Sequence, residues 1–173
     1  MVTLSLFRHA KSSWNNPGLD DFDRSLAPRG VKAAPRMGRY MASEGLEPDI
    51  VLCSTAIRAR QTLELAAAEW KSSPEIRFES GLYHALSADM LRYVHELDDA
   101  LRHAMLVGHN PGMHSLALDL CGAGSEAELE GVRFKFPTAA LAVIDFDRPW
   151  AALTAGEGRL RSFVVPRELK KAS

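Results

Sequence analysis

The sequence predicts an α/β domain of three layers, in which helices cover both faces of a central, mostly parallel sheet. Apolar runs of strand length alternate with segments of helical period along the chain. Clusters of turn-forming residues stand at 15–18, 47–48, 72–74, 121–124 and 154–158, and none is long enough to link two domains. The 173 residues, 46% of them hydrophobic, can bury one sizeable core. We therefore expect one domain over residues 1–173.

Five predicted strands alternate with four predicted helices. The strands span residues 2–7, 49–53, 75–78, 105–107 and 140–146, and the helices span 29–44, 56–70, 88–97 and 111–120. Pro35 interrupts the first helix, and a proline in a helix interior costs about 3 kcal/mol. That helix therefore either kinks or begins at Pro35, and we favour a kink. The segment 122–131, rich in Gly and Glu, is expected to form a mobile surface loop.

Composition excludes several classes of function. The formal net charge of −1 shows no basic excess, so we expect no nucleic-acid partner. We find neither a secretory signal at the start nor an apolar run of membrane-spanning length, so we expect no membrane association. Cys53 and Cys121 lie in apolar segments without metal-like spacing. Free thiols in a reducing cytoplasm are the favoured interpretation, with a disulfide as the alternative.

Arg8 and His9 directly follow the first predicted strand. A neutral imidazole can attack phosphorus and carry the phosphoryl group covalently, whereas a guanidinium holds phosphate oxygens through parallel hydrogen bonds. Most dipeptides of this kind are surface residues, so the pair needs partners before it indicates a site.

Two further strand ends supply such partners. His109 follows a predicted strand within Gly108-His109-Asn110-Pro111-Gly112, where Asn and Pro favour a helix start. Arg58 falls in the first turn of the helix that follows the strand 49–53. In open α/β sheets ligands bind at this edge, and helix N-termini attract anions. The alternative for His109 is a helix-capping turn with an incidental histidine.

Other reactive groups give weaker patterns. Cys53 and Arg58 are one residue short of the Cys-x5-Arg loop of thiol phosphatases, which argues against a cysteine nucleophile. His109 and His114 are five residues apart rather than four, so we predict no metal site there. Asp23 and Arg24 are expected to form a local structural pair.

Taken together, these motifs resemble the histidine phosphatase superfamily, also called phosphoglycerate mutase-like, and most of all its small SixA-type phosphohistidine phosphatase branch. The resemblance covers nearly the whole chain, through residues 6–12, 23–26 with 29–30, 54–62, 82–85, 107–112 and 136–140. It implies the three-layer phosphoglycerate mutase-like fold. It also implies that His9 is the nucleophile and that Arg8, Arg58 and His109 bind the phosphoryl oxygens of a phosphate or similar oxyanion. Such a site requires neither a divalent metal nor a cofactor.

The chain departs from the family at the usual acidic proton donor. His84 stands where a carboxylate is expected, and Glu79 lies too far upstream to align cleanly. Either could supply the proton, and His84 could equally be a surface residue near the pocket. Because a phosphoramidate leaves as an imidazole, it depends less on a general acid than a phosphate ester does.

Only short connections separate these motifs, so we expect no lid over the site. These features favour a metal-independent phosphohistidine phosphatase that acts on a phosphorylated histidine-containing phosphotransfer protein in cytoplasmic signal transduction. One alternative is a small-molecule phosphomonoesterase or phosphoramidase that uses the same phosphoenzyme. Another is a phosphate-binding interaction module without turnover.

Overall fold

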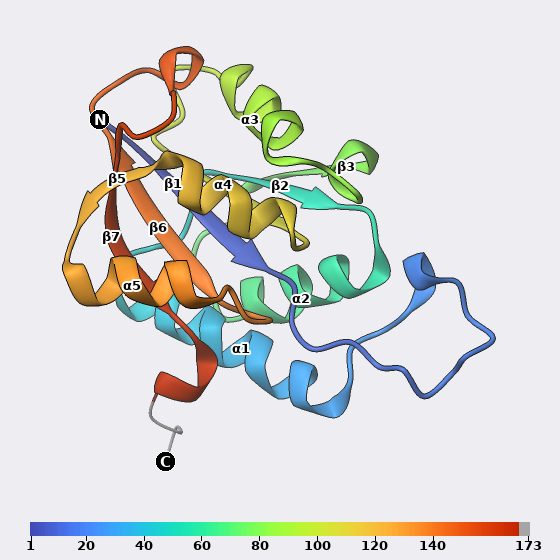
Figure 1. The fold of residues 1–173 in the computed structure, drawn as a ribbon. Helices are drawn as coiled ribbons and strands as arrows, with labels where there is room; N and C mark the ends of the chain where they lie inside the picture. Colours follow the sequence, from blue (N-terminus) through green and yellow to red (C-terminus); the bar gives the residue numbers. More distant parts are fainter. Residues whose placement is uncertain (170–173) are drawn as a thin grey trace.

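A computed structural model describes residues 1–169, in which seven strands form one mixed, mostly parallel sheet (Figure 1). The strands are β1 (Val2–Arg8), β2 (Ile50–Ser54), β3 (Glu75–Glu79), β4 (His103–Gly108), β5 (Cys121–Gly124), β6 (Leu141–Phe146) and β7 (Gly158–Val164). Their order across the sheet is β3-β2-β4-β1-β6-β7-β5. Strand β6 runs antiparallel to both of its neighbours, β1 and β7, whereas the other neighbouring pairs are parallel.

Helices cover the sheet on both faces (Figure 1). The α-helices are α1 (Pro28–Ser43), α2 (Ile57–Ala67), α3 (Ser87–His95), α4 (Gly112–Leu120) and α5 (Glu126–Phe134). Short 3-10 helices are η1 (Asp21–Asp23), η2 (Ser80–Leu82), η3 (Trp150–Ala152) and η4 (Pro166–Glu168). One hydrophobic core joins α1 and α2 to the sheet, and a second joins α3, α4 and α5 to its other face. The predicted three-layer α/β fold is therefore confirmed.

The central strand β1 illustrates how the two cores form. Successive side chains of a strand point to opposite faces, so Leu4 and Leu6 enter one core and Phe7 enters the other. All three side chains are fully buried. Complete burial of both faces leaves only the strand ends accessible, which is where polar chemistry is found in such sheets.

Two parts of the fold differ from the sequence predictions. The segment predicted as a mobile loop contains β5 and most of α5, and the prediction was wrong. Ser125 caps α5 by accepting a hydrogen bond from the backbone N–H of Glu128. Strand β7 was not predicted at all. The predicted first helix is one continuous element, α1, with Pro35 inside it.

The edge at which β1, β2 and β4 end collects the candidate residues. Strand β1 pairs in parallel with β4, and Arg8 is opposite Gly108. Strand β2 flanks β4 on its other side, so three strand ends lie together. Within residues 1–169, no helix is long and apolar enough to cross a membrane, and no three potential ligand side chains converge to hold a metal ion.

Candidate active site

The pairing of β1 with β4 places the two predicted histidines side by side. His9 and His109 each follow a paired residue, and the backbone N–H of His9 donates to the carbonyl of Gly108 at 3.0 Å. The ring centroids lie 5.0 Å apart, and both residues are buried. Residues 100 positions apart in the sequence therefore form one cluster because of a single sheet register.

A backbone carbonyl fixes the tautomer of His9. Nδ1 lies 2.7 Å from the carbonyl oxygen of Ala10, and because a carbonyl can only accept, Nδ1 carries the proton. Nε2 then has a free lone pair. Burial, followed by the charges of His109, Arg58 and Arg8, lowers the pKa of His9 to about 3. The ring is thus neutral near pH 7, as a nucleophilic imidazole must be.

The side chain of Ser54 contacts the ring of His109. Its hydroxyl oxygen lies 2.7 Å from Nε2 of His109 and also accepts a hydrogen bond from the backbone N–H of Ala56. The hydroxyl proton is free to be donated to Nε2, and in that arrangement the ring proton of His109 is on Nδ1. Burial and the nearby charge of Arg58 lower the pKa of His109 to about 4. A neutral ring in this tautomer presents one N–H to a ligand.

Both predicted arginines reach the same cluster. Arg58, in the first turn of α2, donates from Nη1 to the carbonyl of Asp21 at 2.7 Å and from Nη2 to its carboxylate at 3.0 Å. Arg8 donates from Nη1 to the carbonyl of Phe136 at 3.0 Å. Burial and the closeness of Arg58 lower the pKa of Arg8. Two guanidinium groups at close range repel each other unless an anion lies between them.

Unpaired donors mark where such an anion would bind. In the part of the chain that the structure describes, five buried side-chain polar atoms have no hydrogen-bond partner. Three of them are Nε of Arg8, Nε of Arg58 and Nδ1 of His109. A buried donor without a partner costs roughly 1 to 3 kcal/mol, and charged donors bind oxyanions strongly. The cluster therefore offers three unpaired polar groups of a kind that oxyanions can bind.

Sequence reasoning missed Asp21, which lies within this cluster. Its carboxylate accepts hydrogen bonds from Arg58 and Arg24, and from the hydroxyl of Tyr83 at 2.5 Å. The Tyr83 and Arg58 donors hold the pKa of this carboxyl below its usual range. The expected Asp23–Arg24 pair is wrong, because Arg24 forms its ion pair with Asp21, one helical turn earlier. No sequence signal connects Asp21 with Arg58, since 37 residues separate them.

The two candidate proton donors differ in their distance from the cluster. The His84 ring stacks on Tyr83 with centroids 3.9 Å apart, and Tyr83 lies edge-on to His109 at 5.5 Å. His84 is close enough to contribute to the lowered pKa of His109. Glu79 ends β3 and, within residues 1–169, has no hydrogen bond or ion pair to the cluster. The structure thus brings His84 to the margin of the site and leaves Glu79 outside it.

Cys53 does not compete as a nucleophile. It is fully buried in β2, and burial raises the pKa of its thiol to about 12. A thiol with such a pKa holds almost no thiolate at pH 7. Both cysteines are free thiols, as expected.

Comparisons with known proteins give a consistent identification. The model of the histidine phosphatase superfamily (branch 1) matches residues 4–83. An uncharacterised protein of Mycobacterium tuberculosis is 36% identical over 162 residues, which cover 92% of this chain and 99% of the relative.

Solved structures agree with the sequence relatives. A protein of Agrobacterium tumefaciens, provisionally named phosphohistidine phosphatase SixA, is 32% identical and superimposes with a TM-score of 0.82 over 95% of this chain and 98% of its own. The protein histidine phosphatase SixA, solved with tungstate, has a TM-score of 0.79 at 20% identity, with 98% of this chain and 100% of that chain covered. At that identity the second match shows the shared fold alone.

Proposed function

The chain belongs to the histidine phosphatase superfamily, in its SixA-type branch, and from this membership we propose that it is a phosphohistidine phosphatase with His9 as its nucleophile. The observation that carries the proposal is the hydrogen bond between Nδ1 of His9 and the carbonyl of Ala10. It holds a neutral imidazole with a free Nε2 beside three unpaired donors. A site that only bound phosphate would not need an oriented nucleophile.

The reaction proceeds in two displacements. Nε2 of His9 attacks phosphorus and forms a phosphorus–nitrogen bond while the bond to the substrate nitrogen breaks. The substrate imidazole takes up a proton as it leaves. Water then attacks the phosphoenzyme, its oxygen bonds to phosphorus, and His9 leaves as the second imidazole with inorganic phosphate as the product. Arg8, Arg58 and His109 hold the phosphoryl oxygens in both steps and balance their charge without a metal.

The leaving group supports phosphohistidine over a phosphate ester. An alkoxide needs a general acid, yet the carboxylate in the cluster, Asp21, has a lowered pKa and is ionised at neutral pH. An imidazole leaves more easily and takes its proton from a weaker donor. We assign that role to His84, which lies at the margin of the site, rather than to Glu79.

The physiological substrate we propose is phosphohistidine on a histidine-containing phosphotransfer protein, which would give the enzyme a role in signal transduction. The free thiols of Cys53 and Cys121 suit the reducing cytoplasm, where such signalling proteins act. A relative that binds tungstate is consistent with a tetrahedral oxyanion at the cluster.

The experiment is rapid mixing with a labelled phosphodonor, followed by acid or base quench. We expect a phosphoenzyme that is labile in acid and stable in base, absent in His9→Ala and present in the control His95→Ala, which changes a histidine outside the cluster. Wild-type protein should also dephosphorylate a phosphotransfer domain faster than spontaneous hydrolysis. A phosphoenzyme without that acceleration would favour a small-molecule phosphatase. Absence of any phosphoenzyme would favour a binding module and overturn the catalytic proposal.

A further inference from the structure

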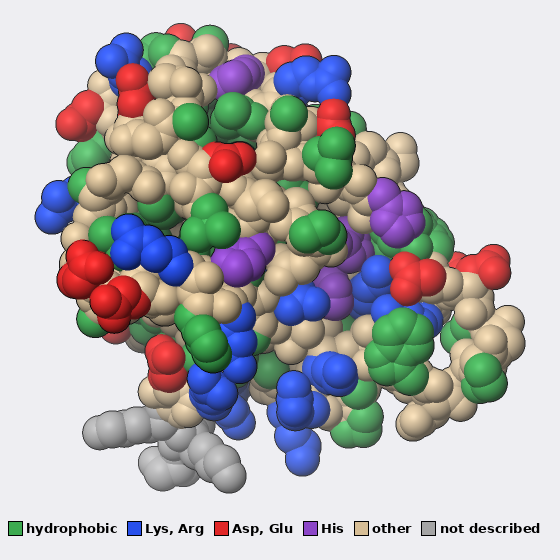
Figure 2. Space-filling model, viewed as in Figure 1, with side chains coloured by type: hydrophobic (Ala, Val, Ile, Leu, Met, Phe, Trp, Pro, Cys, Tyr) green, Lys and Arg blue, Asp and Glu red, His purple; other side chains and the backbone are tan. Residues whose placement is uncertain are grey.

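A second cationic feature of the protein, beyond the cluster around His9, is a groove of about 370 Å³ that we call the basic groove. Its charged lining consists of Lys11, Arg29, Lys32, Arg36, Lys135 and Arg167. Among the residues that the structure describes, no Asp or Glu lines it. Figure 2 shows Lys and Arg side chains gathered in the lower part of the face, next to histidine side chains. The charged side chains that line the groove are therefore all positive, which favours anionic ligands.

The cations of the basic groove are not neutralised by their neighbours. No ion pair found within residues 1–169 uses any of the six side chains. Three of them, Arg29, Lys32 and Arg36, lie in α1 between its first turn and its middle, and the first turn has no acidic residue. The helix dipole disfavours positive charge at this end. Because the whole chain has a formal net charge of −1, this concentration of like charge is local and is relieved when an anionic partner binds.

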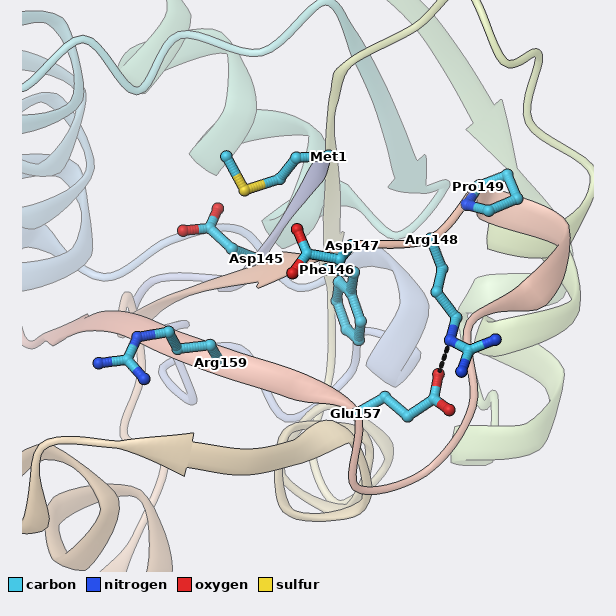
Figure 3. A pocket seen from close by; sticks show the side chains of 8 residues that line it. All are labelled: Met1, Asp145, Phe146, Asp147, Arg148, Pro149, Glu157 and Arg159. Carbon is cyan, nitrogen blue, oxygen red and sulfur yellow. Dashed lines mark ion pairs between the residues drawn. The ribbon is translucent and has the colours of Figure 1, made fainter.

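A cavity at the other end of the sheet, where β1 begins, differs from the basic groove in its charges. It is larger, about 590 Å³, and its lining includes Met1, Asp145, Asp147, Arg148, Glu157 and Arg159 (Figure 3). Its charges are of both signs, and Arg148 pairs with Glu157 at 2.8 Å. That cavity has no net preference for an anion, so size alone does not distinguish the basic groove.

The basic groove adjoins the catalytic cluster. Lys11 follows His9 by two residues, and Pro137 and Thr138 line the groove. The residues on either side of them contact the cluster: the carbonyl of Phe136 accepts from Arg8, and the backbone N–H of Ala139 donates to the carbonyl of His9 at 3.0 Å. A protein that presents its phosphoryl group to His9 would therefore have part of its surface near the groove.

Exposed apolar side chains lie near residues that contact the cluster. Trp14 is 69% exposed, and the guanidinium of Arg24 lies 3.4 Å from the centre of its ring. The same guanidinium donates a hydrogen bond to Asp21 of the cluster. Leu86, two residues after His84, is 68% exposed. Exposed Trp and Leu beside Arg are typical of protein interfaces and are not needed to bind a small anion.

We propose that the basic groove is a docking surface for an acidic face of the protein that carries the phosphohistidine. This inference rests on the proposed function, because it takes the substrate to be a protein. The groove would bind carboxylates of the partner while Trp14 and Leu86 contact its apolar residues and the phosphoryl group reaches His9. Opposite charges on the two surfaces would also speed their encounter.

The test measures binding separately from turnover. In the His9→Ala background, which cannot form the phosphoenzyme, the affinity for a phosphorylated, acidic phosphotransfer domain is measured with and without Lys32→Glu/Arg36→Glu. The control is Arg102→Glu/Arg159→Glu, which makes the same change of charge at the other end of the sheet. Thermal unfolding of each variant verifies that it is folded.

We expect the groove variant to raise the dissociation constant by about tenfold or more and the control to change it by less than about twofold. Raising salt from about 0.05 M to about 0.5 M should weaken binding in the parent and much less in the groove variant. Equal effects of the two variants would overturn the docking proposal. So would a groove variant that loses affinity for inorganic tripolyphosphate but not for the domain, because the groove would then be a small-anion site. Failure of the wild type to hydrolyse a domain that it binds through the groove would overturn the proposed function alone.

Discussion

The hydroxyl of Ser54, the last residue of β2, lies 2.7 Å from Nε2 of His109, the residue that follows β4. The contact links two neighbouring strand ends and directs the proton of His109 toward the unpaired Nδ1 position. If His109 binds the phosphoryl group as we propose, Ser54 is a positioning residue that acts through His109.

Ser54→Ala is expected to lower kcat/KM about tenfold, because removing one hydrogen bond that orients a ligand-binding group costs roughly 1 to 1.5 kcal/mol. The ring of His109 would then populate both tautomers, which NMR of the ring nitrogens can detect. Thr55→Ala is the matched control, since the Thr55 side chain has no hydrogen bond to the cluster. An unchanged tautomer in Ser54→Ala would contradict the assignment.

The ring of His9 is expected to stay neutral far below the usual histidine range. Burial and nearby positive charge lower its pKa to about 3, so the NMR signals of the ring should not titrate between pH 8 and about 5. In urea-unfolded protein the same ring should titrate near 6.5. The sign follows from linkage: the unfolded state binds more protons between these two values, so acidification through that range lowers the stability of the fold. Titration of His9 near 6.5 in the folded protein would refute the neutral nucleophile.

Asp21→Asn is expected to strengthen oxyanion binding. The carboxylate accepts one hydrogen bond from Nη2 of Arg58 and cancels much of its charge, whereas an amide keeps an acceptor without the charge. Because the Asp21 side chain is 44% exposed, solvent screens the pair and the gain in tungstate affinity should be roughly two- to fivefold. Inhibition by tungstate measures it, with Asp23→Asn as the control. Weaker inhibition in Asp21→Asn would mean that the carboxylate mainly orients Arg58.

Gly38→Ala is expected to destabilise the fold by about 1 to 3 kcal/mol. Helix α1 contacts α2 at this residue, and an added Cβ would lie 2.2 Å from the carbonyl oxygen of Ala66. Gly131→Ala in α5 is the opposite case, because its Cβ would meet only ordinary contacts at 3.4 Å. That change should stabilise by roughly 0.5 to 1 kcal/mol through helix propensity. Urea unfolding that gives both variants the same sign would contradict this account of the α1–α2 contact.

The sequence was sufficient to predict which reactive residues lie together when those residues stand at the end of a strand or the start of a helix. Arg8, His9, Arg58 and His109 all lie at strand ends or helix starts, so a parallel sheet brings them together, and their catalytic roles remain predictions. Asp21 lies in the short 3-10 helix η1, within the connection between β1 and α1, where no hydrophobic period indicates the path of the chain.

Three elements, β5, α5 and β7, were missed from the sequence, each for a different reason. Strand β5 has the sequence Cys-Gly-Ala-Gly, which has turn-like composition and is a strand only because β7 pairs with it. Helix α5 carried a usable signal, since Ser125 followed three residues later by Glu128 is typical of a helix N-terminus. Strand β7 alternates between buried and exposed positions at its start, a pattern that would have indicated it.

The hydrogen bond from His9 to Gly108 has a consequence for how the enzyme responds to heat. Since the distance between the two histidines is set by backbone pairing in the middle of the sheet, the reactive geometry exists before any substrate arrives. The two histidines stay side by side as long as the central strands remain paired, whereas Arg58 also depends on the first turn of α2. We therefore expect the pairing of the two histidines to be lost only when β1 and β4 separate.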